Sequence, residues 1–393
     1  MTAKRGVGSA PVKGRRVLVR VDFNVPLDPQ GGVADDRRIV EALPTLQHLR
    51  AAGARSILLS HLGRPGGRKD PRLSLRPVVR RLSALLGQPV PLADDAVGVR
   101  AIDLSARLAN GEFLMLENLR FHPGEEANDP AFAAQLAQLG EVFVEEAFGT
   151  VHRAHASTVG VPKRLPSFAG FLVEREVREL SRLVERPERP YAVIVGGAKV
   201  ADKLPLLESF LGRADSILVG GALAHPFLAA GGAGLGATPI EPGLAGTAEE
   251  FLRRSADVGT GVFLPSDVVV ERPGASAPSV HAVGDVPADA VVQDIGPATI
   301  DRFVAALRGA RTVFWNGPLG RAEDARFAAG TRGVLGSLAG TSGYRVAAGG
   351  DSARVAQELG VAGVFQFIST GGGASLEFVQ GLELPGLAVL PDA

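Results

Sequence analysis

The sequence contains no cysteine, which excludes a disulfide framework, a thiolate nucleophile and any zinc or iron–sulfur site with cysteine ligands. It also has no excess of one charge, because 42 basic residues balance 42 acidic ones. A net charge of zero argues against a protein that binds DNA or RNA by neutralising phosphates along its length. We therefore expect no nucleic-acid partner.

Long apolar runs are missing as well. The most membrane-like stretch, residues 217–237, is interrupted by His225, Pro226 and several glycines, so it predicts a strand, a loop and a helix. Near the N-terminus, the apolar run Val17–Val21 is short and contains Arg20, unlike the core of a signal peptide. The expectation is a cytoplasmic protein that does not associate with membranes.

The fold class follows from length and periodicity. A chain of 393 residues is too long for one ordinary core, so two domains are expected. Short runs rich in Val, Ile, Leu and Phe predict strands at 17–23, 57–60, 113–117, 142–145, 191–195, 216–219, 312–315, 345–348 and 364–368. Amphipathic segments predict helices at 37–51, 74–86, 130–139, 201–211, 248–256, 297–307 and 352–359. This alternation predicts an α/β protein with two Rossmann-like lobes, each a parallel sheet with helices on both faces.

The domain boundary is expected near residue 172. A charged helical segment, Glu174–Glu185, is followed by Pro187 and Pro190, which end a helix and stiffen the entry to the next strand. We predict an N-terminal lobe at 1–172 and a C-terminal lobe at 173–378 that starts with a connecting hinge helix at 174–185. The C-terminal tail, 379–393, is expected to pack back on the N-terminal lobe.

Several familiar phosphate signatures do not occur. The chain has no G-x-x-x-x-G-K-[ST] loop and no His-Arg-Asp or Asp-Phe-Gly set, which excludes a Walker-type ATPase and a protein kinase. The segment from Gly232 to Ala237 fits G-x-G-x-x-A, but Thr238-Pro239 follows where a dinucleotide-binding fold needs a helix.

Arginines and histidines in the N-terminal half cluster just after the predicted strands, in the segments Arg20–Pro26, Ser60–Pro65, Glu117–His122 and Gly149–His155, with Arg38 at the start of the first helix. One such arginine is usually a solvated surface charge, but the carboxyl ends of parallel strands meet at one edge, where ligands bind. The cluster therefore predicts a pocket for a small polyanion gripped by guanidinium groups. A metal site at His152 and His155 is disfavoured, because no acidic or cysteine partner is evident.

Glycine-rich turns in the C-terminal half follow strands and open helices, at Gly196–Lys203, Gly349–Ser352 and Ser369–Gly373, and Trp315–Pro318 follows another strand. Glycine lets a ligand approach the backbone closely, and helix N-termini present free N–H groups to phosphate. Lysine is scarce, with six lysines among 42 basic residues, yet Lys199 and Lys203 both lie at the first of these turns. Together with an aspartate able to hold Mg²⁺, these turns predict a nucleoside triphosphate site.

These motifs resemble the phosphoglycerate kinase family, in the family's order and along nearly the whole chain: Arg20–Pro26, Ser60–Pro65, Glu117–His122, Ala147–Ser157, Gly196–Lys203, Asp294–Pro297, Trp315–Pro318, Gly349–Ser352 and Ser369–Glu377. The resemblance implies a monomeric, two-lobed glycolytic kinase. Its reaction moves a phosphoryl group reversibly between 1,3-bisphosphoglycerate and MgADP, giving 3-phosphoglycerate and MgATP.

The resemblance also implies the roles of individual residues. Phosphoglycerate binding is expected from Asp22, Phe23, Asn24, Arg38, His61, Leu62, Gly63, Arg64, Arg120 and Arg153, with Arg20, His152 and His155 completing the basic patch. Nucleotide binding is expected from Lys203, Asn316, Glu323, Gly349, Gly350, Asp351 and Ser352, with Glu323 at the ribose and Asp351 linked to Mg²⁺. The groups expected around the transferring phosphoryl are Arg38, Lys199, Gly350 and Gly373.

The expected chemistry needs no general base, because the acceptor is a carboxylate that is already ionised at pH 7. Catalysis then consists of positioning the reactants and neutralising charge, which is expected from Lys199, Arg38, helix N-termini and Mg²⁺. Since the two groups of residues lie in different lobes, the lobes are expected to close for reaction and exclude water.

The chain departs from the family's pattern at several positions, most of them in or near the nucleotide half: Glu145-Glu146, Ala222–Pro226, Arg321-Ala322, Ala348 and Phe367. Two other functions are weighed against this one. One is a catalytically inactive nucleotide-binding scaffold, and the other is a kinase for a different small acid. Loss of Lys199, Arg38 or the glycine turns would mark the first, and a changed basic patch would mark the second, whereas all of these features are present.

Overall fold

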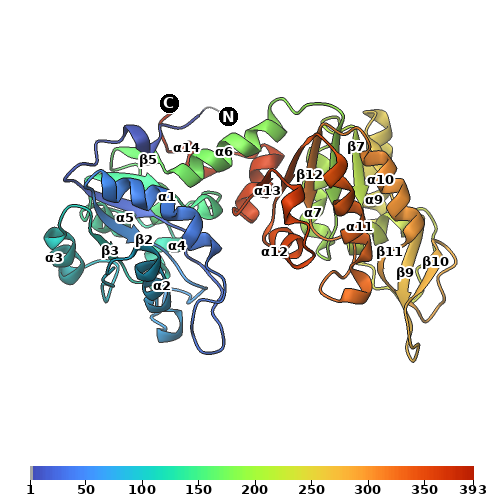
Figure 1. Cartoon of the computed structure of the whole chain (residues 1–393), viewed down its shortest axis with the longest axis horizontal. Coiled ribbons are helices and arrows are strands. Elements are labelled where there is room, and N and C mark those ends of the chain that lie inside the picture. Colours follow the sequence, from blue (N-terminus) through green and yellow to red (C-terminus); the bar gives the residue numbers. More distant parts are fainter. Residues whose placement is uncertain (1–2) are drawn as a thin grey trace. The chain divides into compact units, whose positions relative to one another are not determined.

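The computed structural model describes residues 3–393, which form two compact units (Figure 1). Unit 1 extends to Leu180 and resumes at Leu382–Ala393, and unit 2 comprises Ser181–Gly381. The sequence placed the boundary near residue 172 instead. Within the described residues, no helix combines the length and apolarity that crossing a membrane requires.

Unit 1 is built on a five-stranded parallel sheet in the order β3-β2-β1-β4-β5. Its strands are β1 (Arg16–Arg20), β2 (Arg55–Leu59), β3 (Phe113–Met115), β4 (Val142–Glu145) and β5 (Ser167–Ala169). Its helices are α1 (Arg37–Ala51), α2 (Arg76–Leu86), α3 (Val99–Arg107), α4 (Pro123–Glu126), α5 (Pro130–Ala137), most of α6 (Phe171–Val184), and α14 (Pro385–Ala388).

Alternate residues of the unit 1 strands face opposite sides of this sheet, and each side has its own core. Val17 and Val19 of β1 pack with the apolar stripes of α1 and α2. Leu18, between them, packs with residues of α3 and α5 on the other side. This period of two, with a helical layer over each face, is what a buried parallel sheet requires.

Unit 2 contains a six-stranded parallel sheet in the order β14-β13-β12-β6-β7-β8. Its strands are β6 (Tyr191–Val195), β7 (Ser216–Val219), β8 (Gly261–Phe263), β12 (Thr312–Asn316), β13 (Tyr344–Ala347) and β14 (Phe367–Ile368). Its helices are α7 (Val200–Ser209), α8 (His225–Ala230), α9 (Leu244–Asp257), α10 (Pro297–Leu307), α11 (Ala329–Ser337), α12 (Gly350–Glu358) and α13 (Gly373–Gln380). The predicted α/β class, with two parallel sheets flanked by helices, is confirmed.

A second, antiparallel sheet in unit 2 was not predicted. It has the order β10-β9-β11 and consists of β9 (Asp267–Glu271), β10 (Ser279–Ala282) and β11 (Val291–Ile295). Asp267 joins it to α10, because its carboxylate accepts hydrogen bonds from the backbone N–H groups of Ala298 and Thr299 in the first turn of that helix. An acidic side chain at a helix N-terminus is a favourable cap.

The connecting helix α6 begins as part of unit 1. The N–H of Phe171 donates to the Thr45 hydroxyl, and the N–H of Leu172 donates to the buried Glu146 carboxylate. Arg175 forms an ion pair with Glu41 of α1. The first two contacts satisfy two of the free N–H groups of the first turn, and all three tie the start of the helix to unit 1; the two units divide after Leu180.

Candidate active site

Every polyanion-binding residue that the sequence predicts lies at or just beyond the carboxyl edge of the unit 1 sheet, except Arg38, which lies in the first turn of α1. Arg20 ends β1, and the segment with Asp22 and Asn24 follows it. His61 follows β2, and Arg120 lies in the short turn after β3. The loop after β4 carries Arg153, completing the set.

Backbone hydrogen bonds fix the loop that follows β2. The N–H of Gly63 donates to the Asn24 side chain at 2.9 Å, and Arg120 donates through Nη1 to the carbonyl of Gly63 at 2.9 Å. Asn118 donates to the carbonyl of Leu62 at 2.7 Å. Gly63 has φ +63°, and a Cβ there would lie 2.8 Å from Leu73, so only glycine fits without strain. The same loop carries Arg64, which is exposed.

Arg38 is paired with Asp22 across the carboxyl edge of the sheet. The Asp22 side chain is 10% exposed and that of Arg38 is 33% exposed. The aspartate therefore orients the guanidinium while leaving part of its surface open to a ligand. Aspartate and arginine pair well in this way because the planar guanidinium matches the carboxylate.

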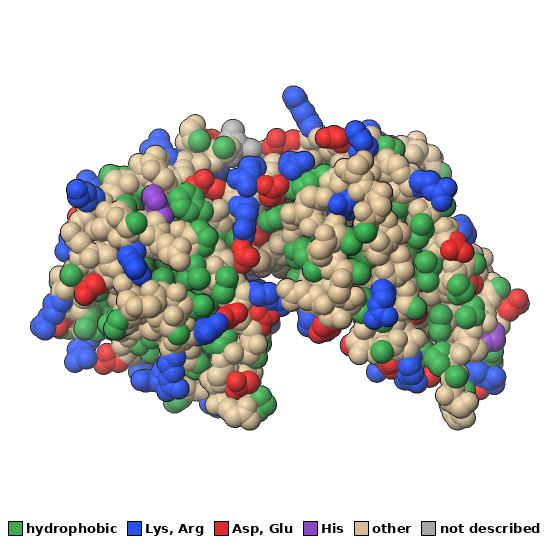
Figure 2. Space-filling model, viewed as in Figure 1, with side chains coloured by type: hydrophobic (Ala, Val, Ile, Leu, Met, Phe, Trp, Pro, Cys, Tyr) green, Lys and Arg blue, Asp and Glu red, His purple; other side chains and the backbone are tan. Residues whose placement is uncertain are grey.

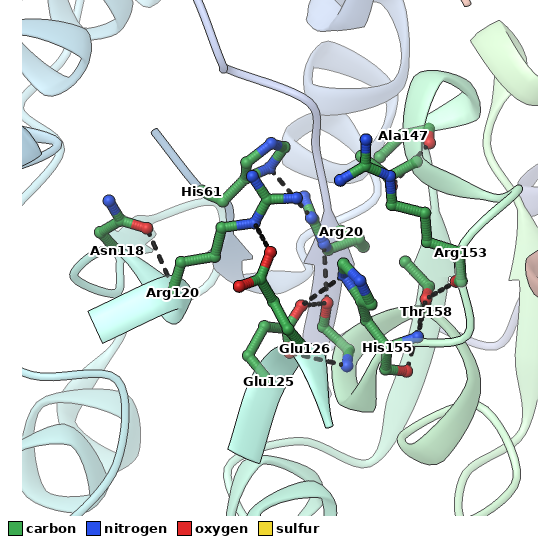
Figure 3. A network of polar contacts seen from close by, with 12 residues as sticks. Arg20, His61, Asn118, Arg120, Glu125, Glu126, Ala147, Arg153, His155 and Thr158 are labelled. Carbon is green, nitrogen blue, oxygen red and sulfur yellow. Dashed lines mark hydrogen bonds and ion pairs between the residues drawn. The ribbon is translucent and has the colours of Figure 1, made fainter. Parts of the chain in front are cut away.

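A buried polar network lies beneath these exposed groups (Figure 3). Arg120 is 4% exposed and forms an ion pair with Glu126. Burial, followed by repulsion from nearby arginines, lowers the pKa of His155 to about 4. The same two causes hold the pKa of His61 well below its ordinary value. Both imidazoles are therefore neutral at pH 7, and the positive charge of the site comes from arginine.

Glu145 and Glu146, which depart from the family's pattern, are both buried. Burial raises the pKa of Glu145 to about 8 and holds that of Glu146 well above its ordinary value. Glu145 accepts a hydrogen bond from the N–H of Ala147, and Glu146 caps α6. Their role in unit 1 is thus to shape the loop after β4 and the start of the connecting helix.

In unit 2, the glycine turns predicted to bind nucleotide pack tightly against each other. A Cβ on Gly196 would lie 2.0 Å from the carbonyl oxygen of Pro318, and Gly317 has φ +85°. At the same turn, the ammonium of Lys203 donates a hydrogen bond to the carbonyl of Gly196. Burial lowers the pKa of Lys203 to about 8, although Asp351 acts in the opposite direction. The Lys203 ammonium thus lies beside the glycine turn, within reach of an anion that binds there.

The second glycine turn is tied to the segment after β12. Ser352 accepts a hydrogen bond from the N–H of Gly317 at 2.8 Å, and Asn316 donates to the carbonyl of Ala348 at 2.8 Å. Gly349 precedes α12 with φ +102°, so that Gly350 and Asp351 form the first turn of the helix. Three helices, α7, α12 and α13, begin at the predicted turns, the last with Gly373.

A cavity of about 600 Å³ lies in unit 2. Its lining includes Asp351 and Glu323 from the predicted set, and Arg321 from the departures noted in the sequence. Lys199, Lys203, Asn316, Gly349, Gly350, Ser352 and Gly373 are not part of the lining. The predicted nucleotide residues are therefore divided between the cavity wall and the turns.

The apolar wall of the cavity was missed by the sequence reasoning. It includes Leu228, Pro265, Val268, Val292 and Leu319. Val268 and Val292 belong to the antiparallel sheet, and neither valine lies in a motif that the sequence analysis singled out. A flat apolar ring fits such a wall, whereas phosphates fit the polar turns.

Magnesium carried by a nucleotide fits the residues present. Among residues 3–393, no group of three or more His, Asp or Glu side chains converges to hold a metal ion. Magnesium bound with phosphates needs no such cage, since one or two carboxylates, the phosphates and water complete its coordination. Asp351 is exposed, lines the cavity and lies at the start of α12. It is therefore suited to this ion.

Charged side chains of both signs are interspersed over the face of the molecule that Figure 2 shows. This distribution agrees with the zero net charge. The concentration of arginine at the carboxyl edge of the unit 1 sheet is thus a local feature suited to a small anion.

Comparison with known proteins gives a consistent result. A family model described as "Phosphoglycerate kinase" matches residues 7–382. A phosphoglycerate kinase of Pelotomaculum thermopropionicum is 48% identical over 99% of this chain and 100% of its own length. One from Thermomicrobium roseum is 50% identical over 98% of this chain and 99% of its own length. The solved structure of phosphoglycerate kinase from Coxiella burnetii aligns with a TM-score of 0.89 at 36% identity, covering 98% of each chain.

Proposed function

The chain belongs to the phosphoglycerate kinase family, whose members transfer phosphate to the carboxyl group of 3-phosphoglycerate, and we propose how its two units divide that reaction. Unit 1 binds 3-phosphoglycerate or 1,3-bisphosphoglycerate, and unit 2 binds MgATP or MgADP. The observation that carries this division is the arginine cluster at the carboxyl edge of the unit 1 sheet, because it matches a small polyanion and recurs nowhere among the turns of unit 2 described above.

In unit 1, the acid substrate is held by charge. Arg64 is exposed, and Arg38 and Arg153 are partly exposed, so each can reach an anionic oxygen. Arginine suits this task because its guanidinium grips carboxylate and phosphate oxygens in pairs. His61 and Asn24 add neutral hydrogen-bonding groups at the same edge.

In unit 2, the nucleotide is held by backbone and by lysine. The N-termini of α7, α12 and α13 present N–H groups at the glycine turns, where phosphate oxygens bind favourably. Lys203 contributes a positive charge next to Gly196. When bound, Mg²⁺ would neutralise phosphate charge and be held by Asp351.

The transfer itself needs positioning and neutralisation of charge. The acceptor carboxylate is ionised at pH 7, so no residue has to remove a proton. We assign the stabilisation of charge on the phosphoryl in flight to Lys199 and Arg38, together with the N–H groups of Gly350 and Gly373. Because the substrates bind to separate units, we infer that the units close around them and exclude water. The enzyme is further proposed to act as a cytoplasmic monomer in glycolysis.

A coupled assay with 3-phosphoglycerate, MgATP and a dehydrogenase reporter tests the function. We expect turnover that requires both substrates, and a Lys199→Ala variant whose kcat falls far more than either substrate's binding weakens. Nucleotide binding without turnover would identify the inactive scaffold. Turnover with another small carboxylic acid, and none with 3-phosphoglycerate, would identify the other kinase.

A further inference from the structure

Arg20 lies in the basic site but is turned away from solvent. It is 1% exposed, and its guanidinium makes three contacts inside the protein (Figure 3). Nε donates to the Ser157 hydroxyl at 2.8 Å, Nη1 donates to the carbonyl of Val21, and Nη2 lies 3.2 Å from Nδ1 of His61. A guanidinium held in this way is not free to grip a substrate.

The contact with Arg20 fixes the proton on His61. A guanidinium carries only hydrogen-bond donors, so the ring nitrogen that faces it must present a bare lone pair. Nδ1 is therefore unprotonated, and the proton of the neutral ring is on Nε2. Arg38, Arg120 and Arg153 surround the same imidazole and further oppose a second proton.

On the other side of Arg20, the hydrogen bonds of Ser157 also have a defined direction. Glu125, in α4, is fully buried and accepts from the Ser157 hydroxyl at 2.6 Å and from the Ser157 N–H at 3.0 Å. Because the single hydroxyl proton of Ser157 goes to the carboxylate, its oxygen is left to accept from Nε of Arg20. One series of hydrogen bonds with a defined direction thus runs through Glu125, Ser157, Arg20 and His61.

We propose that Arg20 is a positioning residue that holds His61 as its neutral Nε2–H tautomer, anchored through Ser157 by Glu125. His61 then offers the acid substrate a neutral hydrogen-bond donor, while the exposed arginines supply the charge. This inference rests on the proposed function in one respect, namely that 3-phosphoglycerate binds beside His61.

The tautomer can be observed directly by long-range ¹H–¹⁵N NMR on the full chain labelled at its histidine ring nitrogens. A His61→Gln variant assigns the His61 signals by their disappearance. We expect a bare Nδ1 and a protonated Nε2 from about pH 8 down to about pH 5.5, below the ordinary pKa of histidine. A protonated Nδ1, or an imidazolium that forms near pH 6.5, would overturn the proposal.

Ser157→Ala tests the anchor, and Ser56→Ala is its matched control. Ser56 is also fully buried, lies on β2, which leads to His61, and has a hydroxyl without a hydrogen-bond partner among residues 3–393. We expect Ser157→Ala, and not Ser56→Ala, to bring His61 into titration at a higher pH and to raise the KM for 3-phosphoglycerate about tenfold at an unchanged KM for MgATP. Unchanged His61 signals in Ser157→Ala would show that Ser157 and Glu125 do not help to position Arg20 and His61.

Adding 3-phosphoglycerate to the labelled protein separates the inference from the proposed function. A shift of the Nε2 signal on binding supports both. A fixed tautomer that does not respond to 3-phosphoglycerate would contradict the place of His61 in the substrate site, while the role of Arg20 would stand on the spectra without substrate.

Discussion

At the scale of single residues, arginine and lysine have different tasks in this protein. Arginine predominates, and its guanidinium groups gather at the carboxyl edge of the unit 1 sheet, some exposed and others, such as Arg20 and Arg120, buried as supports. Lysine is rare, yet Lys203 lies at a glycine turn, where its compact ammonium fits between backbone groups. The difference follows from shape, since the planar guanidinium presents a rigid fork of donors to a pair of oxygens, whereas the ammonium is a compact point charge.

Arg64→Ala should weaken the binding of the acid substrate alone. Arg64 is exposed, so its removal loses a charge-assisted contact of roughly 1.5–3 kcal/mol without leaving a buried group unpaired. Steady-state kinetics should show a higher KM for 3-phosphoglycerate and an unchanged KM for MgATP. Arg68→Ala, at another exposed arginine of the same loop, is the control and should leave both values unchanged. Equal losses for both substrates would contradict the assignment of the sites to separate units.

The binding of nucleotide should weaken as pH rises from 7 to 9. Burial lowers the pKa of Lys203 to about 8, so the free enzyme loses this cation within that range. Because the charged form attracts phosphate, the KM for MgATP should rise through about pH 8, and the KM for 3-phosphoglycerate over the same range provides the comparison. A KM for MgATP that stays constant up to pH 9 would show that Lys203 does not bind as an ammonium.

At the scale of helices and strands, the sequence predicts best where the pattern is local. The helices at residues 37–51 and 297–307 and the strands at 142–145, 191–195 and 216–219 agree with the structure to the residue. Each of these helices and strands is bounded by turn residues or shows a clear hydrophobic periodicity. The strand expected at 17–23 ends at Arg20 instead, because the next residues leave the sheet for a loop in which the N–H of Phe23 donates to the Ser60 hydroxyl.

The elements that were missed depend on contacts distant in sequence. The antiparallel sheet pairs β9 with β11 across a bulge between Val292 and Asp294, and its exposed edge strand β10 has only four residues. The site shows the same division. The sequence predicts motif residues such as Asn24 and Arg64 as site residues, whereas it does not indicate Glu125, because nothing in its own helix shows that Ser157 is its partner.

Gly170→Ala should destabilise unit 1 at the start of α6. A Cβ at this position would lie 1.8 Å from a carboxylate oxygen of Glu146, the group that caps the helix. Relieving the clash breaks the cap or shifts the backbone, which costs roughly 1–3 kcal/mol of unfolding free energy. Urea denaturation measures this loss.

Gly246→Ala is the matched control for this substitution. Gly246 lies in α9, and a Cβ there would meet none of the described atoms within 4 Å. Because alanine favours the helix over glycine, this variant should be unchanged or more stable by roughly 0.5–1 kcal/mol. Equal stability of both variants would show that the Glu146 side chain can move aside at little cost and that its cap of α6 contributes little to stability.

At the scale of the whole molecule, the chain passes between the units twice. Unit 2 is formed by Ser181–Gly381 and is inserted between two parts of unit 1. The ends of the chain pair within unit 1, where the N–H of Arg5 donates to the carbonyl of Pro391 and Lys4 forms an ion pair with Asp392. Any closure of the units must therefore act through α6 and through the return at residues 381–382.

Each substrate alone should protect the unit to which it binds. A ligand that binds only the folded state stabilises its own site by an amount set by its concentration relative to Kd, about 2.7 kcal/mol at a hundredfold excess. Hydrogen exchange followed by mass spectrometry should therefore slow in residues 20–24 and 60–64 with 3-phosphoglycerate, and in residues 196–203 and 349–352 with MgADP. The Arg64→Ala variant should lose the first effect and keep the second, which excludes a general change in stability as the cause. Protection of both sets by one substrate would mean that the first ligand already draws the units together, and the separate binding steps proposed above would have to be replaced by a coupled one.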